Sequence, residues 1–145
     1  MRSLHSLVAA GLLAAVVIVP MTAVAAEPSS DAVLDQRADA IFDLLKAGKG
    51  LEAFDASLGL SPLMAGKEAE RQALAAQFEA AIRVYGPITA VEKVKQTTYG
   101  SMQVKRFYVV QHEKMLTRWE LNFSRLKTGW VVTYFGFEDQ ARTWE

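Results

Sequence analysis

The segment LTRWELNFSR, residues 116–125, alternates apolar and polar side chains. Trp119, Leu121 and Phe123 fall on one side of an extended chain, and polar side chains fall on the other. Successive side chains of a β-strand point to opposite faces of a sheet. The segment therefore predicts a strand whose aromatic side is buried and whose polar side faces something other than the core.

Alternation continues in the neighbouring segments of the C-terminal half. We expect four strands, over residues 88–98, 102–112, 116–125 and 130–138. The connections between them are too short for parallel crossovers, so the strands should form an antiparallel meander. Residues 127–129 fit a three-residue hairpin loop with Gly129 at the position that needs a positive φ.

The N-terminal half has helical periodicity instead. Apolar side chains recur at helical spacing at Leu34, Ala38, Ile41, Phe42 and Leu45. This pattern predicts a helix that begins at Ser30 or Asp31, with an N-cap, and ends before Gly48.

Two more helices are expected before the first strand. Residues 51–59 have the length of a short helix, and residues 67–85 carry an apolar stripe that stops at Gly86-Pro87. Helices followed by a run of antiparallel strands predict an α+β fold, with the N-terminal helices packed on one face of a curved four-stranded sheet.

The first helix also carries a row of acids one turn apart: Asp31, Asp35, Asp39 and Asp43. Such a row does not converge on one metal ion. We interpret it as a solvated helix face. The sequence has no metal-ligand spacing, phosphate loop or nucleophile motif, so we expect neither a metal nor a cofactor.

The first 26 residues have the layout of a secretory signal peptide. Arg2 and His5 precede an apolar run, residues 7–19, that is shorter than the ~20 residues of a spanning helix. Small residues at 23–26 fit a cleavage site. We expect residues 27–145 to form one domain that is periplasmic or secreted. No membrane anchor should remain, because there is no cysteine for lipid attachment.

Charge and cysteine content exclude several function classes. The chain has no cysteine, so disulfides and thiolate metal sites are excluded. Its net charge of zero gives no indication of nucleic-acid binding. Residues 27–87 hold ten acids and six bases, whereas residues 88–137 hold three acids and eight bases. We interpret this asymmetry as acidic surface helices beside lysine-protected edge strands. The alternative is a basic face that meets an anionic ligand or partner.

Pairing inferred from the loops assigns the strand residues to two faces. The face away from the helices combines aromatic side chains with side chains too polar for a core. This mixture favours a protein–protein contact, most simply a homodimer. The candidate interface residues are Phe107, Arg118, Glu120, Trp130 and Tyr134. The alternative is that Trp144 folds back over this face. A bulge in any strand would exchange part of the assignment.

The order of elements and the strand segments GPITAVEKV, YVVQHEK, TRWELNF and GWVVTYFGFED resemble the nuclear transport factor 2-like superfamily, the cystatin-like α+β cone fold. The resemblance covers about residues 31–138, and the small exported bacterial members have no assigned function. It implies a small apolar ligand in the cone between the sheet and the long helix, and dimers through the outer sheet face. The candidate pocket residues are Phe78, Tyr85, Arg106, Tyr108, Trp119 and Thr133.

Enzymes of the superfamily use an Asp base with a Tyr and a second Asp, or a His–Asp pair. Residues 27–145 hold one histidine, His112, and the expected strands contain no Asp. Tyr108 could donate a hydrogen bond, but no base is matched to it, and Asp55 is the least implausible helical base. We therefore expect a non-catalytic ligand-binding protein. The alternatives are an isomerase-like or lyase-like enzyme and a partner-binding or inhibitory module acting through the outer face.

Overall fold

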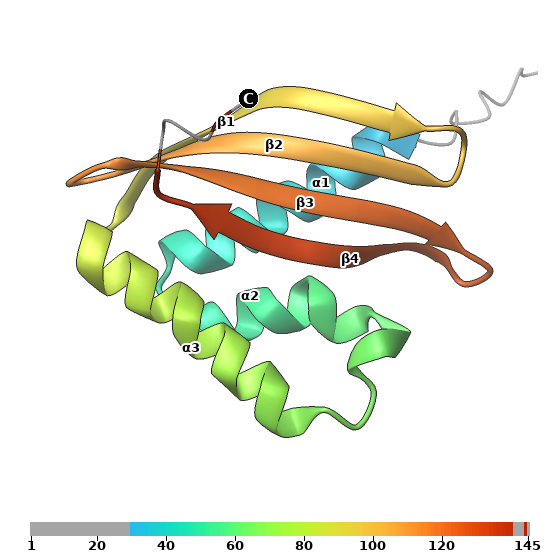
Figure 1. Cartoon of the computed structure of the whole chain (residues 1–145), viewed down its shortest axis with the longest axis horizontal. Helices are drawn as coiled ribbons and strands as arrows, with labels where there is room; N and C mark the ends of the chain where they lie inside the picture. The colour runs from blue at the N-terminus through green and yellow to red at the C-terminus, as the bar shows by residue number, and fades with distance from the viewer. Residues whose placement is uncertain (1–29, 141–143, 145) are drawn as a thin grey trace, which may run out of the picture.

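The helices lie in the first half of the chain and the strands in the second, as expected. The computed structural model describes residues 30–140 and 144, so the predicted signal peptide lies outside the described residues. The elements are α1 (Ser30–Lys46), α2 (Gly50–Ala56), η1 (Leu58–Leu60), η2 (Pro62–Met64), α3 (Glu68–Tyr85), β1 (Ile88–Tyr99), β2 (Gln103–His112), β3 (Leu116–Leu126) and β4 (Gly129–Glu138) (Figure 1). None of the described helices is long and apolar enough to cross a membrane.

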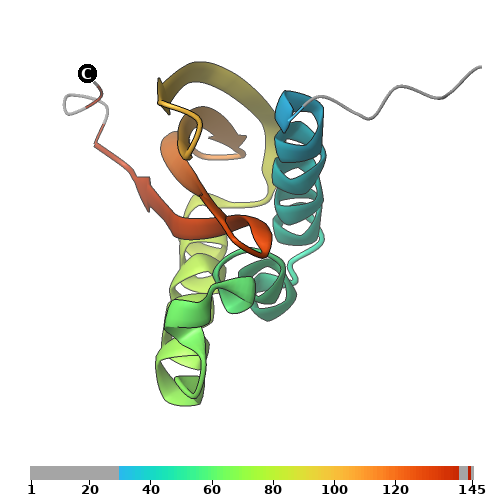
Figure 2. The same cartoon turned by 90° about the vertical axis from the view of Figure 1, so that its right-hand side faces the viewer.

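The sheet is an antiparallel meander in the order β1-β2-β3-β4. The helices cover one of its faces, with α1 lying beside the β1–β2 half and α2 and α3 near β4 (Figures 1 and 2). The five apolar residues predicted to face the core from α1 are all buried. The predicted α+β class is confirmed.

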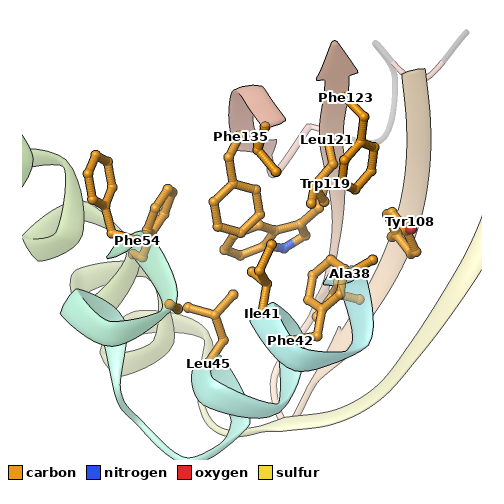
Figure 3. Packing of buried hydrophobic residues seen from close by; sticks show 14 of the residues in the cluster. Ala38, Ile41, Phe42, Leu45, Phe54, Tyr108, Trp119, Leu121, Phe123 and Phe135 are labelled. Carbon is orange, nitrogen blue, oxygen red and sulfur yellow. The ribbon is translucent and has the colours of Figure 1, made fainter. Parts of the chain in front are cut away.

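Trp119 occupies the centre of the core between the sheet and the helices. Its ring stacks on Phe137 with centroids 5.0 Å apart, and it contacts Phe135 at 5.2 Å and Phe78 at 5.6 Å. Figure 3 shows its indole between Phe135 and the apolar side chains of α1. Aromatic rings at these separations contribute beyond the area that they bury. The space between the sheet and α3 is therefore filled by side chains.

The junction between α3 and β1 is held by Gly86 and His112. Gly86 has a φ of 89°, and a Cβ there would lie 2.8 Å from the Cβ of Glu113, so only glycine suits this position. His112 is buried, and its Nδ1–H donates to the Gly86 carbonyl at 3.0 Å. Its Nε2 accepts from Thr117, whose oxygen accepts the Trp119 Nε1–H at 2.8 Å. These bonds connect the helix end to two strands.

The predicted register of β2 with β3 is confirmed. Tyr108 pairs with Trp119, and Arg106 pairs with Leu121, so both β2 side chains lie on the helix-covered face.

The predicted start of β4 is wrong by one residue. Leu126 pairs with Gly129, so the loop has two residues rather than three. A bulge at Thr133 then restores the expected pairing of Leu121 with Phe135. Between the loop and the bulge the faces are exchanged. Trp130 packs against the core from the helix-covered face, whereas the Thr133 hydroxyl bonds to Ser124 on the outer face at 2.9 Å.

Replacement of Trp119 by alanine should lower the free energy of unfolding by about 3 to 5 kcal/mol, because it leaves a large cavity among rigid aromatic rings. Val84 is 64% exposed on α3, so Val84→Ala is the control and should change stability by about 0.5 kcal/mol or less. Chemical denaturation of both variants gives the comparison. Equal stabilities for the two variants would show that Trp119 is not the centre of the core.

Candidate functional site

A buried arginine joins the first helix to the sheet. Arg106 is fully buried, and its guanidinium stacks over Phe123 with 5.7 Å from Cζ to the ring centroid. Its Nε donates to the Gln96 side chain at 2.8 Å, and its Nη1 donates to Asp35 at 2.8 Å. Its Nη2 reaches the backbone carbonyl and the carboxylate of Asp31, each at 3.3 Å. Each guanidinium nitrogen therefore has an acceptor, which a buried charge requires.

The acidic row of α1 is not simply a solvated face. Asp35 also accepts a hydrogen bond from Lys93 of β1 at 2.7 Å. This bond, helped by the positive charges of Arg106 and Lys93 and opposed by partial burial, lowers the pKa of Asp35 from its usual value. The interpretation of the acidic row as a solvated helix face is wrong for Asp31 and Asp35. The reason is that α1 lies across the inner face of β1 and β2, which turns these two acids toward basic strand residues.

A groove of about 330 Å³ opens beside these ion pairs, between α1 and β1. It is lined by Asp35, Asp39, Phe42, Asp43, Lys46, Val91, Lys93 and Tyr108. Its size is at the lower end of the range for small-molecule sites. We call it the α1–β1 groove.

Tyr108 is the buried polar residue of this groove. It is 4% exposed, and its hydroxyl has no hydrogen-bond partner among the described residues. Burial raises the pKa of Tyr108. The Arg106 guanidinium lowers it by its charge and by a hydrogen-bonding contribution, although the two groups do not meet the geometry of a hydrogen bond, and the charges of Asp35 and Asp39 raise it. The ring lies at the edge of the core against Phe42, with centroids 4.9 Å apart (Figure 3). A neutral hydroxyl that is buried without a partner is rare in folded proteins and calls for an explanation.

The other predicted pocket residues lie elsewhere. Phe78 and Trp119 are buried in the aromatic core, in direct contact with each other. Tyr85 donates its hydroxyl to Asp139 at 2.7 Å, and this bond raises the pKa of Tyr85. Thr133 lies at the bulge of β4 and bonds to the outer face. Of the six predicted pocket residues, Tyr108 alone lines the α1–β1 groove, and Arg106 lies behind it, bonded to the lining residue Asp35.

The outer sheet face carries a ring of cations around Phe107. Lys95, Lys105 and Arg118 approach the Phe107 ring to between 5.2 and 5.8 Å from its centroid. Two predicted interface residues form ion pairs here: Glu120 bonds to Lys105 at 3.0 Å, and Arg118 bonds to Glu138 at 2.8 Å.

Trp144 lines a cavity of about 220 Å³ on this outer face, with Val94, Phe107 and Val109 among its neighbours. The described position of Trp144 agrees with the alternative that it folds back over the sheet. Tyr134, also predicted to lie on this face, is 49% exposed. Trp130 is not part of the face, as its place in the core shows.

Sequence reasoning missed Asp35, Asp39 and Lys93 as site residues. The signal for them was present in the opposite net charges of the helical and strand halves, which we attributed to surface solvation. Within residues 30–140 and 144, no three His, Cys, Asp or Glu side chains are arranged to hold a metal ion. Asp55, the helical base considered above, instead pairs with Arg71 at 2.5 Å.

Replacement of Asp35 by asparagine should lower the free energy of unfolding at pH 7 by about 1 to 2 kcal/mol, with allowance for the solvent exposure of this carboxylate. The folded-state pKa of Asp35 is lowered, so its contribution is present above the unfolded pKa and is lost as pH falls through the folded pKa. The stability difference between the two proteins should therefore shrink below about pH 4.

Urea denaturation at a series of pH values measures this difference. Asp55→Asn is the matched control, since Asp55 pairs with a partly exposed arginine and its loss should cost less. A difference for Asp35→Asn that stays constant down to pH 2 would contradict the assignment of the Arg106–Asp35–Lys93 cluster.

No protein-family model and no curated protein matches the chain. Among solved structures it is similar to a Campylobacter jejuni protein described provisionally as an NTF2-like transpeptidase, with 13% identity and a TM-score of 0.49, over 68% of this chain and 95% of that one. The chain itself has the element order and sheet topology that its sequence predicts, with helices followed by a four-stranded antiparallel meander.

Proposed function

We propose that this chain is an exported, non-catalytic protein that binds a small ligand in the α1–β1 groove. The observation that carries the proposal is the hydroxyl of Tyr108, a lining residue of the groove, which is buried and forms no hydrogen bond of ordinary geometry among the described residues. Leaving a buried hydroxyl unpaired costs free energy. A ligand that hydrogen-bonds to it would remove this cost. Export is supported by the signal-peptide pattern of the first 26 residues.

The proposed ligand site lies at the edge of the domain, between α1 and β1, whereas the resemblance implied a site between the sheet and α3. Phe78, Trp119, Phe135 and Phe137 contact one another between the sheet and α3. A ligand there would have to displace packed aromatic rings, which carries a large penalty. The α1–β1 groove needs no such rearrangement, and Tyr108 belongs to both the predicted pocket and the observed one.

An isomerase-like or lyase-like activity is the second candidate, because Asp39 lies in the same groove as Tyr108. Asp39 would act as the base and the neutral Tyr108 hydroxyl as the donor to a developing oxyanion. We favour the non-catalytic function because Asp39 is exposed to solvent, whereas enzymes usually exclude water from the groups that react. Turnover of a bound compound that stops in Asp39→Asn would favour the enzyme.

Native mass spectrometry of the protein purified gently from its own periplasm tests ligand binding. The expected result is an additional mass of a few hundred daltons or less on each chain. Tyr108→Phe should lose most of this mass, because one hydrogen bond of about 1 kcal/mol is removed from the complex. The same substitution should leave the stability of the ligand-free protein unchanged or raise it, since it removes an unpaired buried hydroxyl.

Tyr85→Phe is the matched control. It also removes one tyrosine hydroxyl, but that hydroxyl bonds to Asp139 outside the groove, so the bound mass should remain. Bare chains from every preparation, or equal retention in Tyr108→Phe and wild type, would argue against the groove as a ligand site.

We also propose that the outer face joins two copies of the chain. Support comes from Tyr134, which is 49% exposed beside the Phe107 region, and from the mixed aromatic and charged character of the face. Trp144 lies on part of the same face, so it and a second copy would compete for the surface around Phe107.

Sedimentation velocity tests the dimer. Tyr134→Glu should convert a dimer to a monomer, because it places an uncompensated carboxylate in an apolar contact. Leu63→Glu is the control, since Leu63 is 66% exposed on η2, which belongs to the helical half of the chain and not to the outer sheet face. A wild-type protein that sediments as a monomer at all concentrations would refute the dimer and leave Trp144 as the cover of this face.

A further inference from the structure

We propose that the α1–β1 groove selects a ligand with one ammonium group on an apolar body, and that Asp39 binds the ammonium group. This inference rests on the proposed function, since it names the chemical class of the ligand for the same groove. Three properties of the groove support it: an unpaired carboxylate, apolar lining residues and the buried hydroxyl of Tyr108.

The groove has one carboxylate more than it has cations. Three of its lining residues are acids and two are lysines. Asp35 is bound by Lys93 and Arg106, and Asp43 is bound by Lys46 at 3.3 Å. Asp39 forms no ion pair within the part of the chain that the structure describes. The surplus negative charge of the groove therefore belongs to Asp39, and the groove is complementary to a single positive charge.

The arrangement suits an organic cation better than a metal ion or an anion. A divalent ion takes several converging oxygen ligands, and the described residues offer no such group. An anion would meet the unpaired carboxylate of Asp39 and be repelled. An ammonium group needs one carboxylate and can form charge-assisted hydrogen bonds with it.

Part of the groove lining is apolar. Phe42 and Val91 form it, and the ring of Tyr108 packs on Phe42. Short hydrocarbon or aromatic bodies gain free energy by covering such a surface. Tyr108 belongs to the same lining, and its hydroxyl is buried behind the groove surface. It can accept an N–H of the ammonium group or donate to an oxygen of the ligand once the neighbouring side chains move aside. This second contact would distinguish the groove from an exposed carboxylate on any helix.

Three probes that share a phenylethyl body test the charge preference: phenethylamine, phenethyl alcohol and hydrocinnamate. Two-dimensional amide NMR titrations of the purified protein give their dissociation constants and the residues that shift. We expect phenethylamine to bind about tenfold more tightly than phenethyl alcohol, and hydrocinnamate to bind most weakly. The shifted amides should be those of α1 around Asp39 and of β2 around Tyr108.

Asp39→Asn should weaken the binding of phenethylamine about tenfold and leave that of phenethyl alcohol within about twofold. Glu70→Gln removes one exposed carboxylate from α3 and is the matched control for net charge, so it should change neither constant. Any one of five results would overturn the inference. They are tighter binding of the alcohol or the acid, equal binding of all three probes, amide shifts outside the groove, absence of binding, and a dissociation constant for phenethylamine that Asp39→Asn does not change.

Failure of the ammonium inference can be distinguished from failure of the groove as a ligand site. A co-purified compound that is lost in Tyr108→Phe but retained in Asp39→Asn would leave the groove as a ligand site and refute only the ammonium class. Loss of the compound in both variants, with the probe preference stated above, would support both conclusions.

Discussion

The buried guanidinium of Arg106 is the constraint on which the arrangement of helix and sheet depends. A fully buried charge without acceptors would cost several kcal/mol. Its acceptors come from β1 and, on α1, from Asp31 and Asp35. The helix must therefore lie across β1 and β2 at the height where these acids reach the arginine. That placement also leaves Asp39, one turn further along α1, beside Tyr108, so the charge cluster determines where the groove opens.

The fold could be predicted because its elements have strong and different periodicities. The aromatic alternation around Trp119 and the helical stripe around Phe42 each indicate one buried face, and both faces are buried in the structure. The start of β4 could not be predicted in the same way. A two-residue loop with a bulge and a three-residue loop without one give the same pairing at Phe135. They differ only between Gly129 and Thr133, where apolar residues on both faces provide no periodic signal.

The candidate site was predicted only in part. Arg106 and Tyr108 stand out in the sequence as polar residues on an apolar face, and the structure confirms that placement. Their neighbours on α1 do not stand out, because an acidic row on an amphipathic helix is typical of a solvated surface. Whether such a row faces solvent or a basic strand depends on the position of the helix along the sheet. Single-sequence patterns contain no information about that offset.

The separation of these partners along the chain has a consequence for how the domain assembles. The bonds from Arg106 to Asp35 and Asp31 close loops of 71 and 75 residues. A helix of 17 residues is only marginally stable by itself in water. As the chain emerges N-terminus first, α1 must therefore wait for β2 before its acids find their partner. The groove exists only after this late closure, so ligand binding and completion of the fold form one coupled equilibrium.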